Sequence, residues 1–156
     1  MEISDQIKVF QKLYNVPRET IDQFTKYHEL LIKCQEKTNL VGSGTISTIW
    51  VRHFSDSAKL TDRIIAFKSN YKGIIRICDV GSGAGFPGLV CYLILSSQKY
   101  QIKMSLIESN KKKCDFLNLV TEKLMLPVRI INERVEKIDR KYDIIMSRAV
   151  APLHIL

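Results

Sequence analysis

Four glycines and two acidic residues occur at spacings that could build a cofactor site. The segment D-V-G-S-G-A-G-F-P-G runs from Asp79 to Gly88, and Glu108 lies twenty residues beyond its last glycine. An apolar run precedes this segment and another follows it. A glycine-rich turn from a strand into a helix presents free backbone N–H groups and the positive helix end to a ligand. The spacing therefore favours a ligand-binding turn over one that only reverses the chain.

Strand-like and helix-like segments alternate around this turn. Apolar, β-rich runs occur at 74–80, 103–108, 128–131 and 142–147, and helix-like stretches lie near 86–97 and 110–124. This alternation predicts βαβ units and a parallel sheet with helices on its faces. The third crossover, 132–141, is short for a full helix.

Helical spacing of apolar residues dominates the first sixty residues. One helix is expected from Ile3 to Tyr14. A second begins either at Pro17 or with a capping box at Thr20 and reaches about Cys34. A third is expected from Thr45 to about Ile65. The chain thus divides into a helical segment, 1–67, and an α/β domain, 74–156.

The charge balance points to a polyanionic partner. The 156 residues include 24 basic and 16 acidic side chains, a net charge of +8, which favours nucleic acid without distinguishing it from an anionic membrane surface. The four cysteines form no C-x-x-C pair, so we expect buried reduced thiols, no metal site and a cytoplasmic protein. No apolar run approaches the ~20 residues of a membrane span.

Two cofactors fit the glycine turn. The run from Gly83 to Gly88 satisfies G-x-G-x-x-G, and Glu108 stands where a dinucleotide fold places its ribose-binding acid. That reading predicts NAD. In a dinucleotide fold, however, the first glycine directly follows the strand, whereas Gly81 and Ser82 intervene here.

Read from the strand end, the same segment is D-x-G-x-G-x-G and resembles the first motif of class I methyltransferases. The resemblance implies S-adenosylmethionine as the cofactor. Gly81 and Gly83 would let the backbone approach its methionine part. Asp79 could lie near its sulfonium and amino groups, and Glu108 could accept hydrogen bonds from both ribose hydroxyls.

Further segments make the resemblance more specific. In chain order they are N-L-V (39–41), V-R-H-F-S-D-S (51–57), the glycine turn with its G-F-P-G ending (79–88), R-V-E (134–136) and S-R-A (147–149). Together they are similar to the RsmG, or glucose-inhibited division protein B, family of bacteria. This resemblance implies a class I, Rossmann-like methyltransferase fold with an N-terminal helical segment. Members usually continue past this point, so the α/β domain is expected to be truncated at its C-terminus.

The resemblance also implies roles for single residues. Gly81 and Phe86 would line the S-adenosylmethionine site, and Val135 and Glu136 would contact the adenine end. Arg148 would face both cofactor and target base and is the one residue assigned to catalysis. The implied reaction is methylation of N7 of a guanine in small-subunit ribosomal RNA, free or in the 30S particle, by a monomer. Guanine N7 carries a lone pair, so positioning suffices and His53 is not assigned as a base.

Three basic residues are candidates for RNA contact: Arg52, Lys111 and Arg134. For Arg52 the alternative is a surface ion pair with Asp56, four residues along a helix. For Lys111, first of three lysines, the alternative is a solvated helix face.

Two other functions stay open from the sequence. The basic charge and the early stop would suit a non-catalytic RNA-binding or ribosome-assembly protein. The G-x-G-x-x-G match would suit an NAD-dependent oxidoreductase. Trp50 and Phe54 are expected in the core rather than as base-stacking residues.

Overall fold

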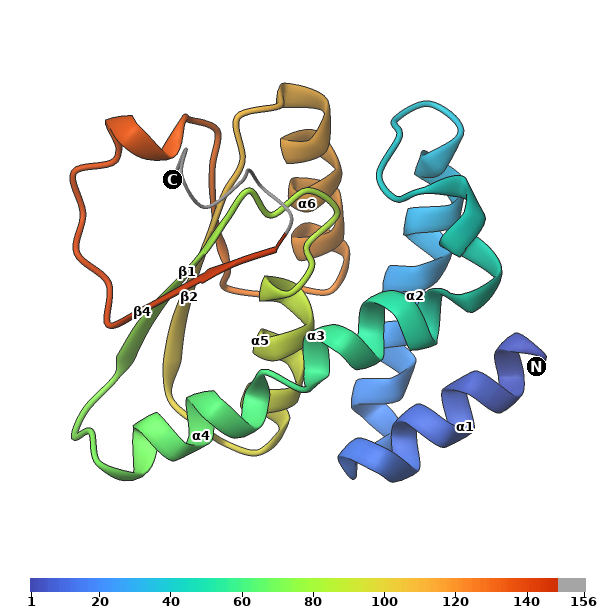
Figure 1. Cartoon of the computed structure of the whole chain (residues 1–156), viewed down its shortest axis with the longest axis horizontal. Helices are drawn as coiled ribbons and strands as arrows, with labels where there is room; N and C mark the ends of the chain where they lie inside the picture. Colours follow the sequence, from blue (N-terminus) through green and yellow to red (C-terminus); the bar gives the residue numbers. More distant parts are fainter. Residues whose placement is uncertain (149–156) are drawn as a thin grey trace.

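The computed structural model describes residues 1–148, and the predicted contributions of Ala149 and the residues after it lie outside this part of the chain. Helices make up the first half, and a parallel sheet with two covering helices makes up the second (Figure 1). The elements are α1 (Ile3–Tyr14), α2 (Arg18–Gln35), η1 (Ser43–Thr48), η2 (Trp50–Ser55), α3 (Asp56–Ala58), α4 (Thr61–Ser69), β1 (Ile75–Val80), α5 (Gly88–Ser97), β2 (Ile102–Ile107), α6 (Lys111–Lys123), β3 (Arg129–Ile131), η3 (Val135–Lys137) and β4 (Ile144–Ser147).

The four strands are parallel and lie in the order β3-β2-β1-β4. The chain moves from β1 outward to β2 and β3, then crosses back to place β4 on the other side of β1. This reversal creates a topological switch point beside β1, where open parallel sheets bind their ligands. The Rossmann-like fold expected from the sequence is confirmed, and the crossover from β3 to β4 contains one short turn, η3, as its length predicted.

The strand register brings the carboxyl ends of all four strands to one level. Val80 lies beside both Ile107 and Ser147, and Ile107 lies beside Ile131. The residue that follows each strand therefore emerges at the same edge of the sheet. Among these residues are Glu108 and Arg148.

One core joins the helical segment to the sheet. Helices α5 and α6 cover one face of the sheet, and α2 packs against both of them (Figure 1). Phe10, Trp50 and Phe54 are fully or almost fully buried, which confirms that the two latter residues belong to the core. Phe54 meets Phe86 of the glycine turn edge-on, with ring centroids 5.2 Å apart. The proposed division at residues 67 and 74 stays a prediction.

Two expectations for the N-terminal helices were wrong. Pro17 is the residue before α2 rather than its first helical residue, and no capping box starts at Thr20. The single helix expected from Thr45 to Ile65 is divided into η1, η2, α3 and α4. The middle piece, η2, is a π-helical turn, and such turns add a residue to the helix circumference. This wider turn places both His53 and Phe54 inside the protein.

Candidate cofactor site

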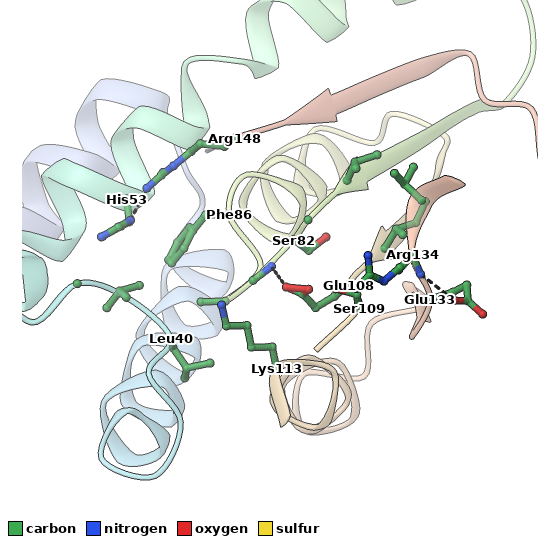
Figure 2. Close-up of a pocket in the computed structure, with 18 of the residues that line it drawn as sticks. Leu40, His53, Ser82, Phe86, Glu108, Ser109, Lys113, Glu133, Arg134 and Arg148 are labelled. Carbon is green, nitrogen blue, oxygen red and sulfur yellow. Dashed lines mark hydrogen bonds between the residues drawn. The ribbon is translucent and has the colours of Figure 1, made fainter. Parts of the chain in front are cut away.

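A cavity of about 780 Å³ opens at the carboxyl ends of the strands (Figure 2). Four parts of the chain line it: the loop before η1, the glycine turn, the segment after β2 and the segment after β3. His53 and Arg148 close one side. The lining residues are Leu40, Val41, Gly42, His53, Val80, Gly81, Ser82, Gly83, Ala84, Phe86, Ile107, Glu108, Ser109, Lys113, Glu133, Arg134, Val135, Glu136 and Arg148.

The backbone of the glycine turn adopts a conformation in which a residue with a side chain would be strained. Gly81, Gly83 and Gly85 have φ values of 69°, 56° and 95°, a region that L-residues other than glycine rarely adopt. A Cβ at Gly85 would also lie 2.5 Å from the Tyr27 hydroxyl. The glycines thus let the backbone face the cavity on one side while it packs against α2 on the other.

Glu108 is held at the cavity wall by backbone groups. One carboxylate oxygen accepts a hydrogen bond from the Gly83 N–H at 3.2 Å and the other from the Asn110 N–H at 3.3 Å. Only 8% of the residue is exposed. A carboxylate has about four acceptor sites, so this one keeps capacity for two donors from a ligand. A pair of neighbouring hydroxyl groups would suit it.

Asp79 lies behind the turn rather than on the cavity wall. Its carboxylate accepts a 2.9 Å hydrogen bond from the N–H of Gly88, the first residue of α5. Burial raises the pKa of Asp79 to about 7, although the Gly88 bond acts in the opposite direction. A Cβ at Gly88 would come within 2.7 Å of this carboxylate. Direct contact between Asp79 and a cofactor therefore stays a prediction.

Arg148 and His53 contact each other above the ring of Phe86. A terminal guanidinium nitrogen of Arg148, Nη2, lies 2.5 Å from His53 Nδ1 (Figure 2). The guanidinium carbon is 5.8 Å from the centre of the Phe86 ring, and the His53 ring stacks on that ring at 5.1 Å. Burial and the adjacent Arg148 charge lower the pKa of His53 to about 4. His53 is therefore neutral at physiological pH.

Most of the predicted cofactor residues line the one cavity. They are Gly81, Gly83, Phe86, Glu108, Val135, Glu136 and Arg148. Arg134, predicted to contact RNA, lines the same cavity. The shared location does not test their individual roles, which stay proposals.

Two of the predicted RNA contacts lie outside the cavity. Arg52 is exposed on η2, and its expected partner Asp56 pairs instead with Lys59 at 2.8 Å. Lys111 pairs with Asp115 on α6. Lys113 lines the cavity, and its backbone N–H donates to the side chain of Asn110, which caps α6. The sequence indicated the three lysines from Lys111 to Lys113 as a possible phosphate-contacting patch, and the candidate chosen from them was Lys111.

The four cysteines are free thiols, three of them buried and Cys34 partly so. Within residues 1–148 no group of three or more histidine, cysteine or acidic side chains could hold a metal ion. In the same part of the chain, none of the helices combines the length and the apolar character that crossing a membrane requires.

Comparison with known proteins assigns the chain to a family. The family model described as rRNA small subunit methyltransferase G matches residues 20–156. Proteins named ribosomal RNA small subunit methyltransferase G are 39% identical in Paramagnetospirillum magneticum, 39% in Caulobacter vibrioides and 41% in Orientia tsutsugamushi. These alignments cover 88%, 92% and 90% of this chain, and 62%, 63% and 65% of the respective relatives. The chain thus spans somewhat less than two thirds of their length.

Among solved structures, a proposed S-adenosyl-L-methionine-dependent methyltransferase of Methanococcus maripaludis aligns with 66% of the chain. The alignment covers 47% of that protein at 17% identity and a TM-score of 0.49. The match of the family model over most of the sequence, together with relatives at about 40% identity, is decisive. The chain belongs to the rRNA small subunit methyltransferase G family.

Proposed function

We propose that the cavity binds S-adenosyl-L-methionine and that the protein transfers its methyl group to N7 of a guanine in 16S ribosomal RNA. Family membership supports the reaction. The observation that carries the cofactor is the placement of Glu108 and the glycine turn on one wall, linked by the Gly83 N–H bond. A backbone surface free of side chains, beside a fixed carboxylate, suits a ligand with an amino-acid part and a ribose.

The geometry of α5 argues against a dinucleotide. A pyrophosphate would require free N–H groups at the start of this helix. The Gly88 N–H is instead bonded to Asp79, and the Leu89 N–H donates to the Gly85 carbonyl at 2.9 Å. The cavity is also lined by Glu108, Glu133 and Glu136. S-adenosyl-L-methionine has no phosphate and therefore does not need free N–H groups at the start of α5. Its sulfonium is positively charged, so acidic residues on the cavity wall do not repel it.

Each wall of the cavity would then hold a different part of the cofactor. Gly81, Gly83 and Phe86 would border the methionine part, and Glu108 would accept bonds from the ribose hydroxyls. Val135 and Glu136, across the cavity after β3, would border the adenine. Asp79 would support the cofactor site indirectly, by holding the start of α5 through the Gly88 N–H. Direct contact between Asp79 and the amino group of the cofactor would require the glycine turn to move.

The chemistry demands positioning more than proton transfer. When bound, the cofactor would supply a methyl group on a positively charged sulfur. Guanine N7 would accept this group with its own lone pair, and the S–CH3 bond would break to leave the neutral thioether S-adenosylhomocysteine. Arg148 would orient the guanine and the cofactor at the closed side of the cavity. Both ring nitrogens of His53 are hydrogen-bonded, so its imidazole is not free to act as a base. This agrees with a reaction that needs none.

The partner would be small-subunit ribosomal RNA, free or assembled, in the cytoplasm, with the protein acting as a monomer. The net charge of +8 supports a polyanionic partner. Lys113 and Arg134 stand on the cavity wall where an incoming nucleotide would approach. Arg52 and Lys111 are exposed and could extend this contact.

Calorimetric titration with S-adenosylhomocysteine, with NAD as the control ligand, tests the cofactor. We expect one-to-one binding of S-adenosylhomocysteine and none of NAD. Glu108→Ala should weaken binding by tenfold or more, since about 1.4 kcal/mol of lost interaction corresponds to a factor of ~10. Glu122→Ala, an exposed acid on α6, is the matched control.

Two outcomes would contradict the proposal. Binding of NAD without S-adenosylhomocysteine would favour the oxidoreductase alternative. Binding of 16S ribosomal RNA without transfer of a radiolabelled methyl group, by a protein that includes the remainder of the family's length, would favour the non-catalytic alternative.

A further inference from the structure

A chain of three hydrogen bonds connects Arg148 to the loop before η1. Arg148 Nη2 contacts His53 Nδ1 at 2.5 Å, and His53 Nε2 contacts the Thr45 hydroxyl at 2.8 Å. The Thr45 hydroxyl donates to the Gly42 carbonyl at 2.7 Å. Gly42, His53 and Arg148 all line the cavity, whereas Thr45 stands behind them.

The donors and acceptors of this chain permit one arrangement of protons. A guanidinium has no acceptor, so His53 Nδ1 must be without a proton to accept from Arg148. The neutral imidazole then carries its proton on Nε2 and donates it to Thr45. The Thr45 hydroxyl accepts that bond and donates its own hydrogen bond to the Gly42 carbonyl. Each hydrogen is used once, so the chain is self-consistent.

The guanidinium is held at one terminal nitrogen and keeps the other terminal nitrogen for a ligand. Arg148 Nη1 is buried and has no hydrogen-bond partner among residues 1–148, while Nη2 is bound to His53. An unpaired buried donor costs free energy unless a ligand or water satisfies it. The Phe86 ring below the guanidinium and the His53 ring beside it leave the arginine little freedom to turn. The unpaired nitrogen is therefore fixed beside the cavity that Arg148 lines.

We infer that His53, oriented by Thr45, is a positioning residue that holds the Arg148 guanidinium for the cofactor and the target base. This inference rests on the proposed function, because it takes the cofactor and the target base to be the groups that Arg148 contacts. A positively charged His53 could not accept from Arg148. The low pKa of His53, caused by burial and by Arg148 itself, keeps the accepting form present. The groups that bear on its charge are Arg148, Arg52 and Asp56.

The tautomer of His53 can be tested independently of any ligand. Long-range ¹⁵N–¹H NMR of the 156-residue chain should show His53 with a bare Nδ1 and a protonated Nε2 from pH 6 to 8. The reverse tautomer, or a charged ring in that range, would overturn the inference. This measurement stands even if the chain binds no S-adenosylhomocysteine and the proposed function fails.

Two matched pairs of variants test the positioning role by titration with S-adenosylhomocysteine. His53→Gln keeps a polar group near the Nε2 position but loses the acceptor for Arg148, whereas His53→Asn keeps an oxygen near the Nδ1 position. Thr45→Val removes the hydroxyl that Thr45→Ser keeps. We expect His53→Gln and Thr45→Val to weaken binding roughly tenfold, and the Asn and Ser variants to recover most of that loss.

Thermal unfolding of each variant serves as the control. Weaker binding by a variant whose melting temperature equals that of the wild type identifies a positioning effect. Equal binding by His53→Gln and the wild type would overturn the inference, as would equal losses in both members of each pair. Absence of binding by the wild type itself would instead count against the proposed function.

Discussion

At the scale of single residues, burial shifts the protonation of Asp79 and His53 in opposite directions. It raises the pKa of Asp79 to about 7 and lowers that of His53 to about 4. Both shifts favour the neutral form, because the interior disfavours charge. Between about pH 4 and pH 7 the folded protein thus favours a protonated acid behind the glycine turn and an uncharged imidazole beside Arg148.

These two shifts should have opposing effects on stability between about pH 4 and pH 7. Folded Asp79 holds a proton that the unfolded chain has lost, so its contribution disappears as pH rises toward 7. Folded His53 lacks a proton that the unfolded chain binds, so its contribution disappears as pH falls from 6.5 toward 4. In the wild type the two effects partly cancel.

Single variants should reveal each effect. For His53→Gln we expect the free energy of unfolding to fall as pH rises from 4.5 to 7.5, by up to about 4 kcal/mol for a shift of this size. For Asp79→Asn the free energy should fall as pH is lowered over the same interval. Urea unfolding at each pH measures both. Identical pH profiles for the wild type and both variants would show that neither group is shifted.

At the scale of elements, Tyr27 connects α2 to the glycine turn. Its hydroxyl donates to the Ala84 carbonyl, and its ring stacks on Phe86 with centroids 5.7 Å apart. Burial, together with the Asp79 charge, raises the pKa of Tyr27 well above its usual range, so the hydroxyl remains a donor. The helical segment thereby supports the backbone that lines the cavity from behind.

Removal of this hydroxyl should loosen the turn. Tyr27→Phe leaves the Ala84 carbonyl without its partner and should cost about 1–2 kcal/mol of stability. We expect roughly threefold weaker binding of S-adenosylhomocysteine, because Ala84 lines the cavity. Calorimetric and denaturant titrations measure the two effects.

The control is Tyr14→Phe, which loses a comparable bond to the Ser55 carbonyl at 2.9 Å but lies outside the residues that line the cavity. It should lower stability without changing affinity. If both variants bound the ligand as the wild type does, Tyr27 would be a core residue without influence on the site.

At the scale of the whole molecule, α5 must pack against other elements on two sides. Its residues 89–95 are all buried, the sheet lies on one side, and α2, α3 and α4 pack against the helix from elsewhere. A helix that is apolar all round must be surrounded. The predicted segments 1–67 and 74–156 therefore depend on each other for burial.

We expect the 156-residue chain to unfold in a single transition. Trp50, the one tryptophan, reports on the helical segment by fluorescence, and circular dichroism reports on all elements. The two curves should coincide. The fragment 70–156 should give no cooperative transition, since it exposes α5. A fragment that melts cooperatively would establish the α/β part as an independent domain.

The sequence alone determined the features that depend on neighbouring residues. The glycine turn from Asp79 to Gly88, the strands around it and the acid at Glu108 all follow from local patterns. Alternating strands and helices require a parallel sheet, and parallel strands bring their carboxyl ends together. For that reason the cavity and most of its lining were predictable.

Tertiary structure decided what depends on contacts between distant segments. The π-turn of η2 that brings His53 inward and the bond from Asp79 to Gly88 leave no periodic signal, and the sequence did not decide which of the three lysines lines the cavity. His53 and Arg148 are separated by 95 positions, and only the packing of η2 beside the end of β4 makes them neighbours. Local propensity fixes the path of the backbone, whereas packing fixes which buried polar groups must satisfy one another.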